Sequence, residues 1–183
     1  MTRSIRGAFV LLTASTLCAT GCFTAVKQAY NEVRGAQAEL LFVGEARQAG
    51  WSQYRSVEFT PATTTIGQRL CPPGLLRTYD MAASQLVSRL KAAYPGGEPA
   101  LTVDSEVVYF QKKGLLSGAL LLARVKMHAD GQPVVDAILK AESQSFRAGG
   151  ENDLAQAGIE ELGKFLRRQK GEPEDRQRHR ADE

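Results

Sequence analysis

Residues 119–146 read ALLLARVKMHADGQPVVDAILKAESQSF, and this stretch decides the fold. Every second residue of 121–127 is apolar, whereas the residues between them include two basic ones. This alternation predicts a strand with one buried face and one face toward water. Asp130-Gly131 is typical of a two-residue hairpin turn. The alternation resumes from Val134 to Phe146, so we expect an antiparallel partner strand.

Two further strands are expected before this hairpin. Residues 54–60 alternate around Val57 and Phe59, and Pro61 ends the pattern. A longer strand is expected over 101–110. Its buried face would be shared by Leu101, Val103, Ser105, Val107 and Tyr109.

A helix is expected between these two strands. Apolar residues recur at helical spacing over about 75–94, and Pro95-Gly96-Gly97 ends the pattern. A strand, a helix and a second strand of this length can form a right-handed crossover between parallel neighbours.

A last helix is expected after Gly149-Gly150. Asn152 or Asp153 would cap its start. Its apolar side includes Gly158, which has no side chain and would let the helix approach the sheet closely.

Residues 24–44 also carry apolar residues at helical spacing. The seam is formed by Val26, Ala29, Val33, Ala36, Leu40 and Val43, at intervals of three and four. The pattern predicts an amphipathic helix. Its apolar side either packs on the chain's own domain or forms a partner face, for which Val26, Val33, Leu40 and Val43 are the candidates.

The sequence therefore predicts the α+β class, with a mostly antiparallel four-stranded sheet packed with helices. The expected order is helix, then strand, helix, strand, strand, strand and helix, with a cleaved signal helix in front. The expected divisions are a signal peptide over 1–21, an anchor and amphipathic helix over 22–50, the α+β domain over 51–169 and a charged tail over 170–183. The tail lacks large apolar residues, so we expect it to be disordered.

The first residues have the three parts of an export signal. Arg3 and Arg6 form a basic head, an apolar stretch follows over 8–17, and small residues precede Cys22. The apolar stretch is shorter than the roughly 20 residues that a permanent membrane helix needs.

The end of this segment resembles a bacterial lipobox, with Ala19-Thr20-Gly21 before Cys22. The resemblance implies cleavage between Gly21 and Cys22 and a lipid on the Cys22 thiol, with palmitate-type acylation. Phe23, rather than Asp, follows the cysteine, which favours the outer membrane over the inner one. Ordinary signal cleavage at the same place is the alternative, and it would release the chain into the periplasm.

Charge and cysteine content exclude several classes. The formal net charge is +3, and two of these charges, Arg3 and Arg6, leave with the signal, so the mature chain carries +1. Nucleic-acid binding needs a clustered basic face, and none is evident. Cys18 leaves with the signal and Cys22 would be blocked by lipid, so Cys71 would have no disulfide partner.

No catalytic or metal-binding signature is found, and no cofactor is expected. The sequence has no nucleophile elbow and no phosphate-binding loop. Two arrangements come nearest to such a signature. One is a metal site of His128, Asp136 and Glu142 across the hairpin, and the other is a nucleophilic pair of Cys71 with His128.

The second half, from Leu101 to Leu166, resembles small bacterial envelope lipoproteins that are classed as domains of unknown function. The likeness rests on a strand, a glycine-containing turn, a long strand ending in Asp130-Gly131, a return strand and a helix ending in Lys164-Phe165-Leu166. It implies an auxiliary role in an envelope complex and no catalytic residues.

Three hypotheses follow from the sequence. The first is a lipid-anchored, non-enzymatic envelope protein that binds another envelope protein through the helix over 26–43 or the turn over 112–118. The second is a periplasmic carrier of a small ligand or lipid, with a cavity between sheet and helices. The third is a thiol enzyme that uses Cys71.

Overall fold

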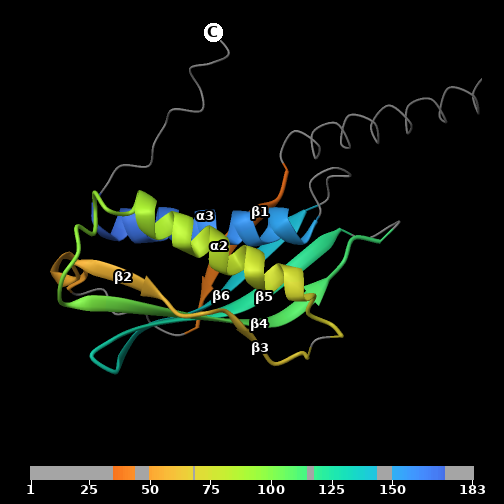
Figure 1. Cartoon of the computed structure of the whole chain (residues 1–183), viewed down its shortest axis with the longest axis horizontal. Helices are drawn as coiled ribbons and strands as arrows, with labels where there is room; N and C mark the ends of the chain where they lie inside the picture. The colour runs from red at the N-terminus through yellow and green to blue at the C-terminus, as the bar shows by residue number, and fades with distance from the viewer. Residues whose placement is uncertain (1–34, 44–49, 68, 115–117, 144–149, 172–183) are drawn as a thin grey trace, which may run out of the picture.

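The computed structural model describes residues 35–43, 50–67, 69–114, 118–143 and 150–171. They form two layers, with two helices side by side on one face of a sheet (Figure 1). The strands are β1 (Gln37–Phe42), β2 (Ser56–Phe59), β3 (Thr63–Thr64), β4 (Ala100–Gln111), β5 (Ala119–Ala129) and β6 (Gln132–Ser143). The helices are α2 (Pro73–Arg89), α3 (Glu151–Gln169) and a short 3-10 turn, η1 (Trp51–Gln53).

The sheet is mixed and has six strands, so the prediction of a mostly antiparallel four-stranded sheet was too simple. Its order is β1-β6-β5-β4-β2, and β3 also pairs with β4. The pairs β1–β6, β6–β5 and β5–β4 are antiparallel, and the hairpin pattern predicted the pairing of β5 with β6. The β2 and β3 strands run parallel to β4, and the chain passes through α2 between them and β4. The α+β class and the parallel crossover are confirmed.

The predicted helix over 24–44 is wrong where the structure describes it. Residues 37–42 form β1, which pairs with β6 over six residues. Residues 26 and 33 of the proposed seam, and the signal helix, lie outside the described residues. Both a strand and a helix can bury Leu40, and the open edge of β6 decides between them by offering a full hydrogen-bond ladder.

The hairpin of β5 and β6 forms as the sequence predicts. Residues 121, 123, 125 and 127 are buried, and so are 135, 137, 139 and 141 on the return strand. Asp130 and Gly131 both have positive φ angles, of 49° and 72°, as a hairpin turn of this length requires.

A β-bulge changes the far end of β4. The register with β5 shifts between Val107 and Tyr109, so the alternation of side chains slips by one residue. Tyr109 therefore lies on the outer face, 42% exposed, and Phe110 packs against the core instead. The prediction that Tyr109 shares the buried face of Leu101 is wrong for this reason.

Glycines let α3 pack closely. A Cβ atom at Gly158 would lie 2.8 Å from Leu139 Cδ2 on β6, which confirms the predicted close approach to the sheet. A Cβ atom at Gly163 would lie 2.5 Å from Leu86 Cδ1 on α2. The cap of α3 is Gly150, and Asp153 accepts the Gly150 N–H at 3.1 Å from the third helical position.

Candidate functional site

The helices cover one face of the sheet, and no described element covers the other (Figure 1). We call this other side the open face. The side chains of the open face come from alternate positions of β1, β6, β5 and β4. The strand register therefore fixes which of these side chains are neighbours.

One half of the open face carries apolar side chains. Leu41 lies beside Ile138, and Leu122 lies beside Tyr109 in the next row. Leu41 is 46% exposed, and Leu120, Leu122 and Ile138 are partly exposed. We call these five residues the apolar patch.

Ion pairs border the apolar patch. Arg124 donates two hydrogen bonds to Asp136, Nε to Oδ1 at 3.0 Å and Nη2 to Oδ2 at 2.6 Å. Lys140 Nζ lies 3.0 Å from Glu39 Oε1 and 3.1 Å from Glu142 Oε2. The patch thus has charged neighbours that are already paired with each other.

These contacts shift the ionisation of the groups involved. The hydrogen bonds from Arg124 hold the pKa of Asp136 below its ordinary value, and the same contact raises the pKa of Arg124. The bonds to Glu39 and Glu142 raise the pKa of Lys140. Each of these three shifts favours the charged form of its group, for Asp136, Arg124 and Lys140 alike.

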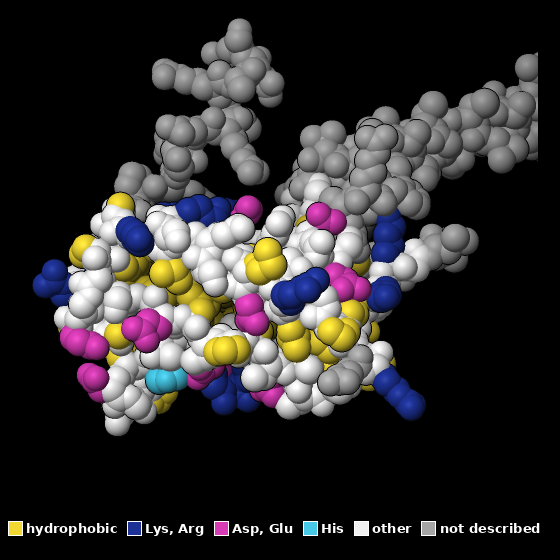
Figure 2. Space-filling view, in the orientation of Figure 1, with side chains coloured by type: hydrophobic (Ala, Val, Ile, Leu, Met, Phe, Trp, Pro, Cys, Tyr) yellow, Lys and Arg dark blue, Asp and Glu magenta, His cyan; other side chains and the backbone are white. Residues whose placement is uncertain are grey.

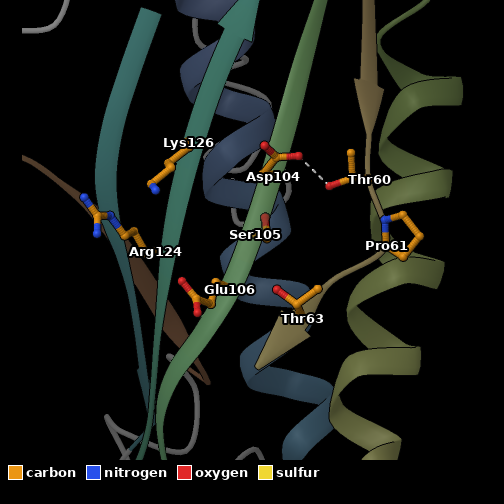
Figure 3. Close-up of a pocket in the computed structure, with 8 residues that line it drawn as sticks. All are labelled: Thr60, Pro61, Thr63, Asp104, Ser105, Glu106, Arg124 and Lys126. Carbon is orange, nitrogen blue, oxygen red and sulfur yellow. Dashed lines mark hydrogen bonds between the residues drawn. The ribbon is translucent and has the colours of Figure 1, made fainter. Parts of the chain in front are cut away.

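The other half of the open face is polar and hollowed. The hollow lies where the sheet edge breaks between β2 and β3, and it has a volume of about 340 Å³. Figure 3 shows its lining from three neighbouring segments: Thr60, Pro61, Thr63, Asp104, Ser105, Glu106, Arg124 and Lys126. Thr60 Oγ1 donates to Asp104 Oδ1 at 2.7 Å, and His128 Nδ1 lies 3.3 Å from the other oxygen of Asp104.

The charged side chains do not gather by sign. Figure 2 shows lysine and arginine mixed with aspartate and glutamate over the visible face, with apolar side chains between them. In the hollow, too, Arg124 and Lys126 stand beside Asp104 and Glu106. The face shown in Figure 2 and the hollow therefore show no basic stripe of the kind that binds a phosphate backbone.

The structure separates the residues of the considered catalytic and metal sites. Asp136 pairs with Arg124, Glu142 with Lys140, and His128 contacts Asp104, so the hairpin trio does not converge. Within the part of the chain that the structure describes, no cluster of three metal-ligating side chains occurs.

Cys71 lies far from His128. Cys71 is 2% exposed and contacts Thr64. The positions of the two residues can be compared along β4, because Thr64 pairs with Val107 and His128 pairs with Thr102. Five residues of β4 separate these levels, or about 16 Å of strand. Burial raises the pKa of the Cys71 thiol, the opposite of what a thiolate nucleophile needs.

Of the four candidate partner residues, the structure describes two, and these two differ in exposure. Leu40 is partly buried against the core, and Val43 is 53% exposed just after β1. Val26, Val33, Gly21 and Cys22 lie outside the described residues, as does the middle of the turn over 112–118. No helix within the described ranges is long and apolar enough to span a bilayer.

Sequence reasoning missed the open face as a site, although alternation had already placed Arg124, Lys126 and Asp136 on one side of the hairpin. The missing signal was the strand character of 37–42, which extends this face, together with the bulge that adds Tyr109 to it.

Fold and surface together define a two-layer α+β domain with one open sheet face. No family model matches the chain, and no curated protein matches it. Among solved structures it is similar to a PelC dodecamer from Paraburkholderia phytofirmans, at 10% identity and a TM-score of 0.43, over 70% of this chain and 95% of that one. A variant of the same PelC dodecamer matches at 9% identity, with the same TM-score and coverage. A likeness this distant carries no conclusion about function.

Proposed function

We propose that this chain is a lipid-anchored protein of the cell envelope that acts by binding another envelope protein through the open face. In this proposal it has no catalytic role. The single observation that carries the proposal is the apolar patch on a sheet face that no described element covers, bordered by ion pairs. Protein–protein interfaces commonly combine apolar side chains with polar and charged groups that are paired.

The anchor comes from the sequence alone. Cys22 would carry the lipid after cleavage behind Gly21, and two or three acyl chains hold a protein on a membrane durably, since each buried methylene contributes about 0.8 kcal/mol. Phe23 favours the outer membrane, with the domain facing the periplasm. The lipid would confine the open face to the membrane surface, where the partner would also lie.

The paired charges support a protein partner over a strongly charged ligand. Arg124, Asp136, Lys140 and Glu39 neutralise each other within the face, so a partner can cover them without leaving an isolated charge buried. The apolar patch would supply the affinity, and the ion pairs would set its orientation.

A cross-linking experiment in living cells tests this proposal. A photoreactive phenylalanine analogue replaces Tyr109 on the open face, and in a matched control it replaces Met81 on α2, which is 58% exposed on the opposite layer. We expect a discrete cross-linked protein from position 109 that is absent from position 81 and lost with Cys22→Ala. Identical products from both positions, or none from position 109, would contradict the proposal.

A second candidate function is the binding of a small polar ligand in the hollow between β2 and β3. Its volume of about 340 Å³ lies in the range of small-molecule sites, and it offers hydroxyl, carboxylate and cationic groups together. A lipid carrier is less well supported, because the apolar crevice beside Val57 and Leu90 holds only about 140 Å³. Native mass spectrometry of the full chain tests ligand retention, and Lys126→Ala should abolish any retained mass that belongs to the hollow.

A further inference from the structure

The two edges of the sheet differ in how they are protected. The edge formed by β2 and β3 is short and broken at Pro61, and the Ala62 N–H is taken by Asp80 Oδ1 at 2.8 Å. Proline, a break and a side-chain acceptor are standard means of preventing strand addition. The opposite edge, β1, has no proline and no lysine over Gln37–Phe42.

The backbone groups on the outer edge of β1 can be assigned from the register. β1 and β6 keep one register over their whole length, because the residue numbers of every pair add up to the same value. Val43 and Asp136 continue this register, and the Val43 N–H donates to Asp136 O at 2.8 Å. In an antiparallel pair both polar groups of a residue point the same way and alternate along the strand. Residues 37, 39, 41 and 43 therefore bond to β6, and the N–H and C=O groups of Ala38, Leu40 and Phe42 point outward.

The side chains at this edge are apolar on both faces of the sheet. Leu41 projects onto the open face, 46% exposed, and Val43 is 53% exposed. Phe42 lies on the helix side, 45% exposed, with its ring 5.4 Å from that of Phe165. No strand of the described ranges pairs with the outer edge of β1, so three neighbouring apolar residues stand beside unpaired backbone groups.

We propose that β1 pairs with β1 of a second copy of this chain, antiparallel and across a twofold axis at Leu40, to form one continuous sheet. Such an interface is isologous, because the same strand serves both copies. It uses the outward groups of Ala38, Leu40 and Phe42 and leaves the open face to the partner of the proposed function.

Charge and overlap select this register. An axis at residue 39 would set Glu39 opposite its own copy, and like charges directly opposite destabilise a sheet. An axis at residue 41 would shorten the overlap. With the axis at Leu40, Glu39 lies opposite Leu41 of the second copy, and Phe42 lies opposite the small Ala38. Glu39 also stays neutralised by Lys140, 3.0 Å away within its own chain.

Disulfide trapping with two different variants tests the pairing and its register. Full-length chains with Cys18 and Cys22 changed to serine carry either Glu39→Cys or Leu41→Cys, and Cys71 is kept because it is buried. Residues 39 and 41 of opposite copies would form a pair without hydrogen bonds, with Cα atoms about 4.5 Å apart, within reach of a disulfide. We expect mild oxidation to cross-link the mixture, and each variant alone to cross-link no faster than a Met81→Cys control.

A second pair of variants separates the backbone contribution from the side chain. Ala38→Pro removes an N–H that the monomer does not use, whereas Ala38→Val keeps it. Two inter-copy hydrogen bonds would be lost, so we expect Ala38→Pro to weaken self-association by about 10- to 100-fold in sedimentation experiments. Ala38→Val should associate like the wild type.

Three results would overturn the inference. One is a wild-type chain that stays monomeric at high micromolar concentration, which would mean that the chain's own segments cover β1. Another is equal cross-linking of the single variants and their mixture, which would mean random collision. The third is an oligomer that Ala38→Pro leaves unchanged, which would place the contact elsewhere.

Discussion

Gly163 is expected to set the distance between α2 and α3, and Gly163→Ala tests this. In an exposed helix interior, alanine in place of glycine stabilises by about 0.5–1 kcal/mol. Here the new methyl would lie 2.5 Å from Leu86 Cδ1 and 3.5 Å from Leu86 Cδ2, whereas ordinary contacts begin near 3.4 Å. Leu86 is 1% exposed, so its side chain has little space to move.

The expected net effect is destabilising. Overpacking a core typically costs about 1–3 kcal/mol, which exceeds the gain in helix propensity. We expect Gly163→Ala to lower the free energy of unfolding by about 1 kcal/mol and the melting temperature by about 4 °C. Urea and thermal unfolding followed by circular dichroism measure both quantities, and Glu160→Ala on the exposed side of α3 controls for helix propensity.

The sign should reverse when Leu86 is truncated. Leu86→Ala removes the three atoms that the new methyl would meet, Cγ and both Cδ atoms, at a cost of about 2–5 kcal/mol. In that background Gly163→Ala should stabilise by about 0.5–1 kcal/mol, since only the propensity gain and some cavity filling remain. The reasoning is refuted if Gly163→Ala stabilises the wild-type chain too, or if its effect is the same in both backgrounds.

Three further predictions concern ionisable groups. The folded pKa of Asp136 lies below its unfolded value of 3.8. The pair with Arg124 therefore stabilises the fold above pH 3.8, and this stabilisation is lost as pH falls through the folded pKa. Arg124→Gln should destabilise the chain more at pH 7 than at pH 2, as measured by urea unfolding. The Tyr79 hydroxyl donates to Ser105 Oγ at 3.1 Å, and its full burial raises the pKa of Tyr79 to about 12. Absorbance at 295 nm should therefore show Tyr79 neutral at pH 11. The free energy of unfolding should fall between pH 10 and 12, because this tyrosine ionises first in the unfolded chain. Tyr79→Phe alone should cost about 1–2 kcal/mol, and combining it with Ser105→Ala should cost less than the sum of the two single changes. The Cys71 thiol should resist a disulfide reagent at pH 8 in the folded chain and react in urea, and rapid labelling without urea would contradict its burial.

Most of the core could be predicted from the sequence, because alternation and helical spacing report directly on burial. Alternate residues over 121–127 of β5 and 135–141 of β6 are buried as the spacing indicated, and Gly158 was recognised as a contact. The contact between Leu86 and Gly163 joins two helices and has no local signal in the sequence. Pairwise contacts of this kind depend on the way distant elements meet.

The misassigned region shows what spacing cannot decide. The seam from Val26 to Val43 fits a helix, yet the alternation of Ala38 and Leu40 with Glu39 and Leu41 fits a strand equally well. The unpaired edge of β6 favours the strand, and that edge exists only once the hairpin has folded. The same limit hid the open face, because its apolar patch joins β1, β6, β5 and β4.

The most direct test of the proposed function compares partner recovery by two single variants, one on the open face and one on the helix layer. Ile138→Glu places a charge in the apolar patch, at the position between Leu41 and Arg124 on the neighbouring strands, and Met81→Glu places one on the helix layer. Each full-length chain is purified from cross-linked cells, and the recovered proteins are measured by quantitative mass spectrometry. We predict that one envelope protein is recovered with the wild type and with Met81→Glu and is lost with Ile138→Glu, while the melting temperature stays unchanged. Equal recovery with Ile138→Glu, or loss with Met81→Glu alone, would contradict binding through the open face.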